Sequence, residues 1–224
     1  MSYNYLFKYI VVGEAGVGKS CILRRFETGQ YDEGIPATTG VEFVRKELTI
    51  DGHKIIAQVW DTAGSEQLYS LTSNYFKNCC ACLIVFDLTN PKSFERVKLW
   101  MQRVEDNANA LARKVLIGNK ADLTLERMIP KEEASAFAAK NKMDYFEVSA
   151  KSNQNIVESF LKLTQNVFLD LKSGKIQASQ DSEFGVKPGV LPSPIAAQAP
   201  AETANPSRGI ASLKTTLEKK NCCK

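Results

Sequence analysis

Short apolar and β-branched runs alternate along the chain with segments of helical periodicity. About 170 of the 224 residues follow this alternation, which is enough for a single hydrophobic core. Alternation of this kind predicts an α/β fold, in which helices cover both faces of a sheet. The runs expected to form strands are 7–12, 41–50, 54–60, 81–87, 114–119 and 145–148.

The turn signals between these runs predict how the elements connect. The runs 41–50 and 54–60 flank Asp51-Gly52, a pair that favours a tight hairpin turn, so they are expected to pair antiparallel. A helix is also expected over about 68–77. The other helices are expected to begin at residues that suit a first turn or a glycine-rich start, namely near Gly18, Pro91, Pro130 and Asn155.

The composition changes after Lys172. Proline and glycine are scattered there among alanine, serine and glutamine, and no periodic apolar face is visible. Such a segment buries too little surface to offset its conformational entropy. We therefore expect a domain over 1–172 and a disordered tail over 173–224.

Composition and charge exclude several classes of protein. Hydrophobic residues make up 44% of the chain, but no apolar run approaches the ~20 residues that a membrane-spanning helix needs. The N-terminus lacks the basic and apolar segments of a signal peptide, so the chain is expected on the cytosolic side. A net charge of +4 is too small to indicate nucleic-acid binding by itself.

The cysteines indicate neither disulfides nor zinc. The only histidine, His53, is distant in sequence from all the cysteines, which argues against a zinc site. Buried thiols are expected for the four cysteines beside or inside apolar segments, which are Cys21, Cys79, Cys80 and Cys82.

A phosphate-binding motif follows the first predicted strand and opens the first predicted helix. Its glycines let backbone N–H groups approach phosphates, and the helix N-terminus favours their negative charge. Lys19 is expected to reach the β- and γ-phosphates, and the Ser20 hydroxyl to ligate Mg²⁺. The residues expected to bind nucleotide here are Gly13, Glu14, Ala15, Gly16, Val17, Gly18, Lys19, Ser20 and the adjoining Cys21.

A second motif indicates which base is bound. Asn119-Lys120-Ala121-Asp122 follows a buried strand, at the sheet edge where α/β proteins bind ligands. A carboxylate at Asp122 can accept hydrogen bonds from guanine N1–H and the exocyclic amine, a pattern that adenine lacks. Ser149, Ala150 and Lys151 follow the next strand and are expected to close the base pocket.

The order and spacing of these motifs resemble the Ras superfamily of small GTPases, and within it the Rab family of the secretory and early endosomal, Golgi-associated type. The resemblance covers about 5–172 and the C-terminal cysteines, and it implies a P-loop small-GTPase fold with a six-stranded, mostly parallel sheet that has one antiparallel strand. Besides the two motifs above and 149–151, the segments that are similar are 38–43 (Thr-Thr-Gly-Val-Glu-Phe) and 60–64 (Trp-Asp-Thr-Ala-Gly).

The resemblance implies further site residues. Thr38, eighteen residues after Ser20 as in the family, corresponds to the switch I threonine that joins Mg²⁺ when a γ-phosphate is present. Tyr31 is implied to stack on the guanine, Asp61 to hold Mg²⁺ through a water, and Gly64 to donate its N–H to the γ-phosphate. One phosphate would thereby order both switch segments.

Two positions depart from the Rab pattern. Ser65 stands where the family has a glutamine that orients the attacking water, and serine is too short to span that distance, so slow hydrolysis is expected. Gln67 is an alternative source of that amide. Thr39 replaces an apolar residue that effectors contact, so a different choice of partner is expected.

The C-terminus resembles a lipidation site. Cys222 and Cys223 correspond to the paired cysteines that receive geranylgeranyl groups in Rabs, and two lipid chains anchor a protein stably whereas one does not. Residues 214–224 contain four lysines and one glutamate, and this net charge of +3 favours anionic membranes. Two unmodified thiols are the alternative.

The sequence therefore predicts a monomeric, membrane-anchored GTP/GDP switch that regulates vesicle traffic from the cytoplasmic face of Golgi, ER–Golgi or endosomal membranes. Its expected partners are Mg²⁺, effectors, an exchange factor, a GTPase-activating protein, and prenylation escort and extraction proteins. A GTP-binding scaffold with negligible hydrolysis is the alternative that Ser65 raises. A P-loop nucleotide kinase is disfavoured, because no lid with phosphate-binding arginines is apparent.

Overall fold

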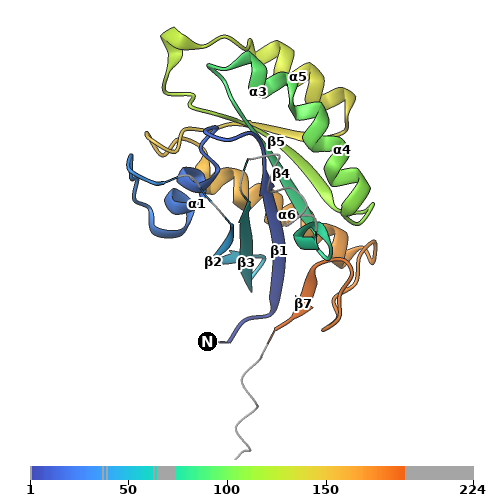
Figure 1. Cartoon of the computed structure of the whole chain (residues 1–224). Helices are drawn as coiled ribbons and strands as arrows, with labels where there is room; N and C mark the ends of the chain where they lie inside the picture. The colour runs from blue at the N-terminus through green and yellow to red at the C-terminus, as the bar shows by residue number, and fades with distance from the viewer. Residues whose placement is uncertain (1, 37, 39, 63, 65–73, 190–224) are drawn as a thin grey trace, which may run out of the picture. The chain divides into compact units, whose positions relative to one another are not determined.

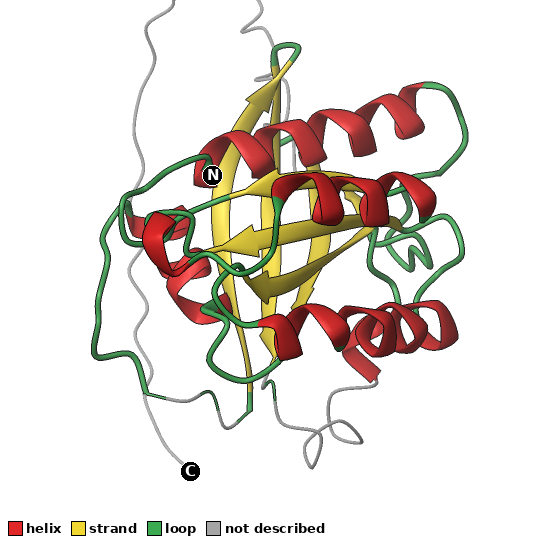
Figure 2. Cartoon of the chain, turned by 90° about the horizontal axis from the view of Figure 1, so that it is seen from above, coloured by secondary structure: helices red, strands yellow, loops and turns green. Residues whose placement is uncertain are grey.

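The computed structural model describes residues 2–36, 38, 40–62, 64 and 74–189. They form a central sheet with helices on both faces (Figures 1 and 2). The strand order is β2-β3-β1-β4-β5-β6, and β7 also pairs with β1. The strands are β1 Tyr5–Val12, β2 Val41–Ile50, β3 His53–Thr62, β4 Ala81–Asp87, β5 Arg113–Asn119, β6 Asp144–Glu147 and β7 Val186–Pro188.

Pairing is parallel at the centre of the sheet and antiparallel at one edge. β1 lies between β3 and β4, with Tyr5 opposite Ile55 and Tyr9 opposite Ala81, and both pairings are parallel. β2 pairs antiparallel with β3 across the Asp51-Gly52 turn. The mixed α/β fold expected from the sequence, with its mostly parallel sheet and its antiparallel hairpin, is confirmed.

The helices begin where the turn and capping residues predict. Asn90 caps α3, since its side chain accepts a hydrogen bond from the Lys92 backbone N–H at 3.1 Å, and Pro130 and Asn155 immediately precede α5 and α6. The helix expected over 68–77 lies largely outside the described residues, of which 74–76 are helical. The helices are α1 Lys19–Thr28, α3 Pro91–Glu95, α4 Val97–Asn107, α5 Lys131–Lys140 and α6 Ile156–Lys172, with a 3₁₀ turn, η2, at Thr124–Glu126.

Each face of the sheet has its own core. On one face α1 and α6 pack on β1 and β3, and the rings of Phe26 and Phe160 stack at 3.9 Å. On the other face α4 and α5 cover β4 and β5 (Figure 1), and Trp100 of α4 is buried in this second core. Burial on both faces explains why β4 is apolar along nearly its whole length.

A seventh strand lies where the sequence predicted a disordered tail. After α6 the chain folds back, and β7 pairs antiparallel with the first residues of β1, so that Tyr5 lies opposite Pro188 and Phe7 opposite Val186. The sequence predicted six strands and a disordered tail from residue 173. The structure instead has a seven-stranded sheet, and the chain up to residue 189 folds against it. The physical reason is that β4 pairs with β1 only from Tyr9 onward, which leaves the earlier backbone groups of β1 for β7.

Close packing at Gly185, the residue before β7, fixes the position of this strand against β1. Its carbonyl accepts a hydrogen bond from the Lys8 N–H at 2.8 Å. Its φ is +68°, and a Cβ there would lie 2.6 Å from the Asn78 carbonyl oxygen and from the Cys79 Cα, so only glycine fits. Ile176 and Val186 are buried in the core formed by α1, α6 and the sheet.

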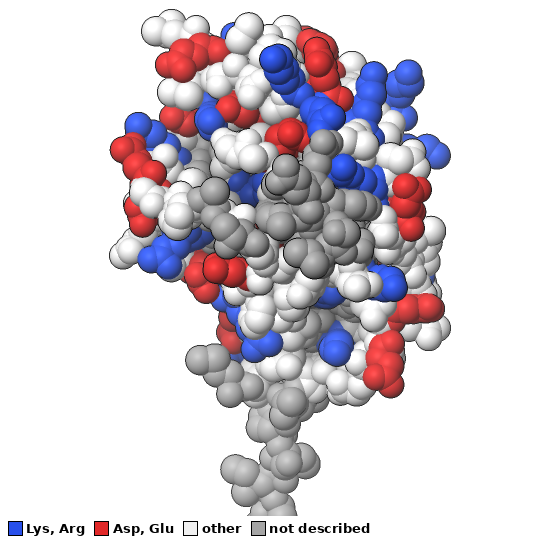
Figure 3. All heavy atoms as spheres, viewed as in Figure 1, with Lys and Arg blue, Asp and Glu red and all other residues white. Residues whose placement is uncertain are grey.

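Basic and acidic side chains are intermingled on the face of the molecule shown in Figure 3. This distribution agrees with the small net charge of +4. Within the described ranges, no helix is both long enough and apolar enough to cross a bilayer.

Candidate functional site

Two adjoining cavities lie beyond the carboxyl ends of β1 and β5, where α/β folds bind ligands. Their volumes are about 290 and 310 Å³, and both are lined by Gly16, Gly18 and Cys21. The first, which we call the base cavity, is also lined by Tyr31, Asn119, Lys120, Asp122, Leu123, Ala150 and Lys151. The second, which we call the phosphate cavity, is also lined by Ala15, Lys19, Ser20, Ile35, Pro36, Thr38 and Gly64.

The loop 13–20, which we call the phosphate loop, holds its lysine in a fixed position. The Lys19 Nζ donates to the carbonyls of Gly13 and Glu14 at 2.8 and 2.9 Å, and only 6% of the residue is exposed. Burial lowers the pKa of Lys19 to about 8, although the carboxylates of Asp61 and Glu14 oppose the shift. A buried ammonium with two carbonyl partners is suited to bind an anion.

Gly64 lies directly against the phosphate loop. A Cβ built on Gly64 would come within 2.5 Å of the Ala15 N and 2.6 Å of the Lys19 Nζ. Any other residue would therefore displace the loop or the ammonium. The structure thus brings Gly64 to the phosphate cavity, as the sequence predicts.

Three oxygen-bearing side chains meet beside Lys19. The Ser20 hydroxyl donates to the Asp61 Oδ2 at 2.5 Å, and the Thr38 hydroxyl lies 2.8 Å from Ser20 and 3.3 Å from the same Oδ2. Burial raises the pKa of Asp61, whereas the hydrogen bond from Ser20 and the Lys19 charge lower it. The Asp61 Oδ1 is buried and has no hydrogen-bond partner among the described residues. An orphaned carboxylate oxygen beside two hydroxyls suits a hard cation such as Mg²⁺.

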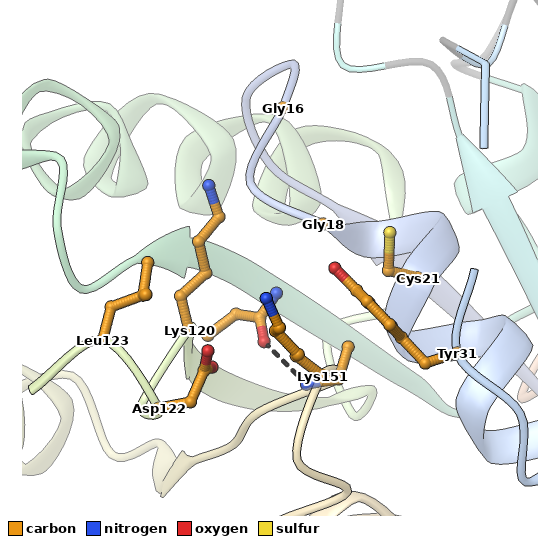
Figure 4. A pocket seen from close by; sticks show the side chains of 10 residues that line it. Gly16, Gly18, Cys21, Tyr31, Lys120, Asp122, Leu123 and Lys151 are labelled. Atoms are coloured by element: carbon orange, nitrogen blue, oxygen red, sulfur yellow. Dashed lines mark hydrogen bonds between the residues drawn. The ribbon is translucent and has the colours of Figure 1, made fainter. Parts of the chain in front are cut away.

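The base cavity has the predicted residues on opposite sides. In Figure 4 Lys120 and Asp122 line one side, and Tyr31 and Cys21 line the other. The Ser149 hydroxyl donates to the Asp122 Oδ1 at 2.6 Å, which fixes the orientation of this carboxylate. An oriented carboxylate in a partly apolar cavity can select a ligand that offers two adjacent N–H donors.

Asn119 connects two loops from inside the protein. Its Nδ2 donates to the Val17 carbonyl at 2.8 Å, and its Oδ1 accepts from the Ala150 N–H at 3.3 Å. The residue is 2% exposed. Its amide therefore holds the phosphate loop and the loop 149–151 in register with each other.

Arg25 also supports the site, although no sequence motif predicts it. From α1, its Nε donates to the Ala150 carbonyl and its Nη2 to the Lys151 carbonyl, both at 2.8 Å. Its guanidinium also lies 5.7 Å from the centre of the Tyr31 ring. No motif marks this residue, because it contacts backbone carbonyls that any sequence supplies. Its place nearly two turns into the helix that follows the phosphate loop is the one signal in the sequence.

Several predicted residues lie elsewhere or lack a description. The Val17 side chain is in the core, the Glu14 side chain points to α4, and Lys120 forms an ion pair with Asp87 at 2.7 Å. Of these three residues, only Lys120 lines one of the two cavities. Outside the described residues are Thr39, Ser65, Gln67, Cys222 and Cys223.

Comparison with known proteins agrees with this geometry. Residues 8–169 match the model of the Ras family. The chain is also similar to "Ras-related protein Rab-13" of Bos taurus, with 38% identity over 173 residues that cover 77% of this chain and 84% of the relative.

Proposed function

This chain belongs to the Ras family and is a Rab-type small GTPase, and we propose that it regulates membrane traffic as a switch whose GTP and GDP states differ around Thr38 and Gly64. The observation that supports this proposal most directly is the pair of adjoining cavities that meet at Gly16 and Gly18. The base cavity presents the Asp122 carboxylate, which suits the N–H donors of guanine. The phosphate cavity presents the buried ammonium of Lys19, which suits the phosphates of the nucleotide.

In the proposed complex the base lies against Tyr31 and the Asp122 carboxylate accepts from its N1–H and exocyclic amine. Lys120, Ala150 and Lys151 enclose the base. Lys19 and the backbone N–H groups of the phosphate loop neutralise and orient the phosphates, since such preorganised groups stabilise charge without rearranging. Cys21 borders both cavities and is proposed to contact the nucleotide at their junction.

Ser20, Thr38 and Asp61 are proposed to hold Mg²⁺. Mg²⁺, when bound, supplies positive charge that stabilises the phosphate oxygens. In support of this role, their oxygens already lie within hydrogen-bond distance of one another, and the Asp61 Oδ1 has no other partner among the described residues.

The switch depends on what the γ-phosphate adds. Thr38 comes from the segment before β2, and Gly64 from the segment after β3. Each lines the phosphate cavity, so a terminal phosphate can hold both segments at once, and its loss releases both. Effectors, an exchange factor and a GTPase-activating protein are the proposed readers and regulators of these two conformations.

We further propose that intrinsic hydrolysis is slow, because Ser65 cannot orient a water as glutamine does. The test is single-turnover GTP hydrolysis by the purified protein and its Ser65→Gln variant. We expect the glutamine to accelerate hydrolysis about tenfold or more, corresponding to about 1.4 kcal/mol of barrier or more. An unchanged rate would refute this account of Ser65.

The same measurement addresses the scaffold alternative. If the wild-type protein completes no turnover while GTP stays bound, the chain acts as a GTP-loaded scaffold that only exchange or extraction can reset. Ser65 is the one feature that favours this alternative.

Membrane attachment is proposed to use geranylgeranyl groups on Cys222 and Cys223, aided by the basic residues around them. Golgi, ER–Golgi and endosomal membranes are the proposed sites, with prenylation escort and extraction proteins handling the lipidated chain. A Cys222→Ser, Cys223→Ser double variant is expected to become cytosolic in cells. Unchanged membrane association of that variant would contradict lipid anchoring.

A further inference from the structure

The Glu14 side chain points away from both cavities, although its backbone belongs to the phosphate loop. Its Oε1 accepts a hydrogen bond from the Trp100 indole Nε1 at 2.9 Å and from the Arg96 Nε at 3.2 Å. Arg96 and Trp100 are one helical turn apart at the start of α4, so they present both donors on the same face. A single carboxylate oxygen therefore joins the phosphate loop to α4.

Of these two partners, Trp100 is the more deeply buried. It is 2% exposed, so its N–H needs an acceptor inside the protein, and a charged acceptor gives a stronger bond than a neutral one. The Arg96 and Glu14 side chains are 41% and 26% exposed, and solvent weakens an ion pair of this kind. The indole bond is accordingly the principal link, and the guanidinium supplements it.

The backbone of the same residue touches the reactive part of the site. The Glu14 carbonyl accepts from the Lys19 Nζ at 2.9 Å. Gly64 packs on the peptide bond between Glu14 and Ala15, where a Cβ would lie 2.5 Å from the Glu14 carbonyl carbon. This one peptide therefore lies between Lys19, the proposed phosphate-binding lysine, and Gly64 of the segment after β3.

We propose that Glu14 is a positioning residue that couples α4 to the phosphate loop, so that its bonds to Trp100 and Arg96 hold the Glu14–Ala15 peptide in place and slow the release of nucleotide. The inference rests on the proposed function, since it concerns the nucleotide bound in the same cavities. It assigns a role to a side chain that touches neither base nor phosphate. Active sites require their binding groups to be held within a fraction of an ångström, so a loosened peptide is expected to weaken the hold on phosphate.

The test is the dissociation rate of a fluorescent GDP analogue, measured in excess Mg²⁺ from the full-length protein. We expect Glu14→Ala to release GDP about tenfold faster, because it removes a charged acceptor with two donors. Glu14→Gln retains an acceptor oxygen and is expected to restore most of the slow release. Trp100→Phe, which removes only the indole N–H from the link, is expected to give an intermediate rate.

A matched control separates positioning from mere stabilisation. Asp170 on α6 accepts two hydrogen bonds from Arg113 at 2.6 and 2.8 Å, outside both cavities. Asp170→Asn is expected to lower Tm as Glu14→Ala does but to leave the release rate unchanged. Unchanged release from Glu14→Ala, or equal acceleration by Asp170→Asn, would overturn the inference. Failure of the wild-type protein to bind GDP would instead overturn the proposed function.

Discussion

The Arg25 Nε donates to the Ala150 carbonyl at 2.8 Å, and this bond ties α1 to the loop that encloses the proposed guanine site. Its Nη2 reaches the next carbonyl, that of Lys151, at the same distance. The two bonds place the loop in a defined position relative to the phosphate loop, which leads directly into α1.

Arg25→Met keeps the apolar stem of the side chain and removes its donors. We expect the Kd for GDP to rise about tenfold, since each lost hydrogen bond is worth about 0.5–1.5 kcal/mol. Titration of the purified protein with a fluorescent GDP analogue measures this. Arg24→Met changes the exposed neighbour on the same helix and is expected to alter the Kd much less; equal effects of the two variants would contradict the proposed role of Arg25.

Nucleotide binding is expected to take up a proton near pH 8. Burial lowers the pKa of Lys19 to about 8, below its ordinary value, so about half of the ammonium is deprotonated at that pH. Phosphate oxygens favour the charged form and raise the pKa again. Lys19 therefore takes up about half a proton at pH 8 and close to none at pH 6, where the terminal phosphate of GDP, with a pKa of about 6, instead releases protons on binding.

Calorimetric titration with GDP in buffers of different ionisation enthalpy measures that uptake. We expect the buffer dependence of the apparent enthalpy to show net proton uptake at pH 8 and no net uptake at pH 6. An enthalpy that is independent of the buffer at pH 8 would refute the shifted pKa of Lys19.

The seventh strand makes a prediction about stability. Gly185→Ala adds a Cβ that would contact the Asn78 and Cys79 backbone, so we expect a loss of about 2–3 kcal/mol in the free energy of unfolding. Gly174→Ala is the matched control, because Gly174 also has a positive φ, +75°, but has open space around it, and about 1 kcal/mol is expected. Denaturant titrations compare the two, and equal losses would mean that the packing of Gly185 contributes nothing.

Thr38 is expected to contribute to Mg²⁺ binding only when a γ-phosphate is bound. Thr38→Ala removes a proposed Mg²⁺ ligand of the GTP state, so the Mg²⁺ concentration needed to slow release of a GTP analogue should rise about tenfold while that for GDP stays constant. Thr49→Ala, at an exposed position on β2, serves as the control. An equal change for both nucleotides would argue against a role restricted to the GTP state.

The sequence predicted most of the sheet and its helices because burial on both faces leaves a strong apolar signal, as in β4. The sequence also predicted that Lys19, Ser20 and Asp122 lie at one edge of the sheet, because the motifs that contain them directly follow strands. It did not predict β7, because that strand is three residues long and pairs mainly through backbone hydrogen bonds, with Val186 its one fully buried side chain.

The parts of the site that were missed share a physical cause. Arg25 acts on backbone carbonyls, and the Glu14 side chain acts on an indole N–H that lies eighty-six residues away. Neither partner is visible in a local pattern, because both contacts depend on the tertiary fold. Motifs predict which residues surround a ligand, whereas the residues that support them become apparent only in the structure.

The central claim is that this site binds guanine nucleotides through the Asp122 carboxylate, and the most direct test is competition binding to the wild-type protein and Asp122→Asn. The account predicts that GTP and GDP, but not ATP, compete for the wild-type site. It also predicts that Asp122→Asn loses about 100-fold or more in GDP affinity while gaining affinity for xanthosine diphosphate, because an amide offers a donor where the carboxylate accepts. Competition by ATP for the wild-type site, or unchanged GDP affinity in the variant, would contradict it.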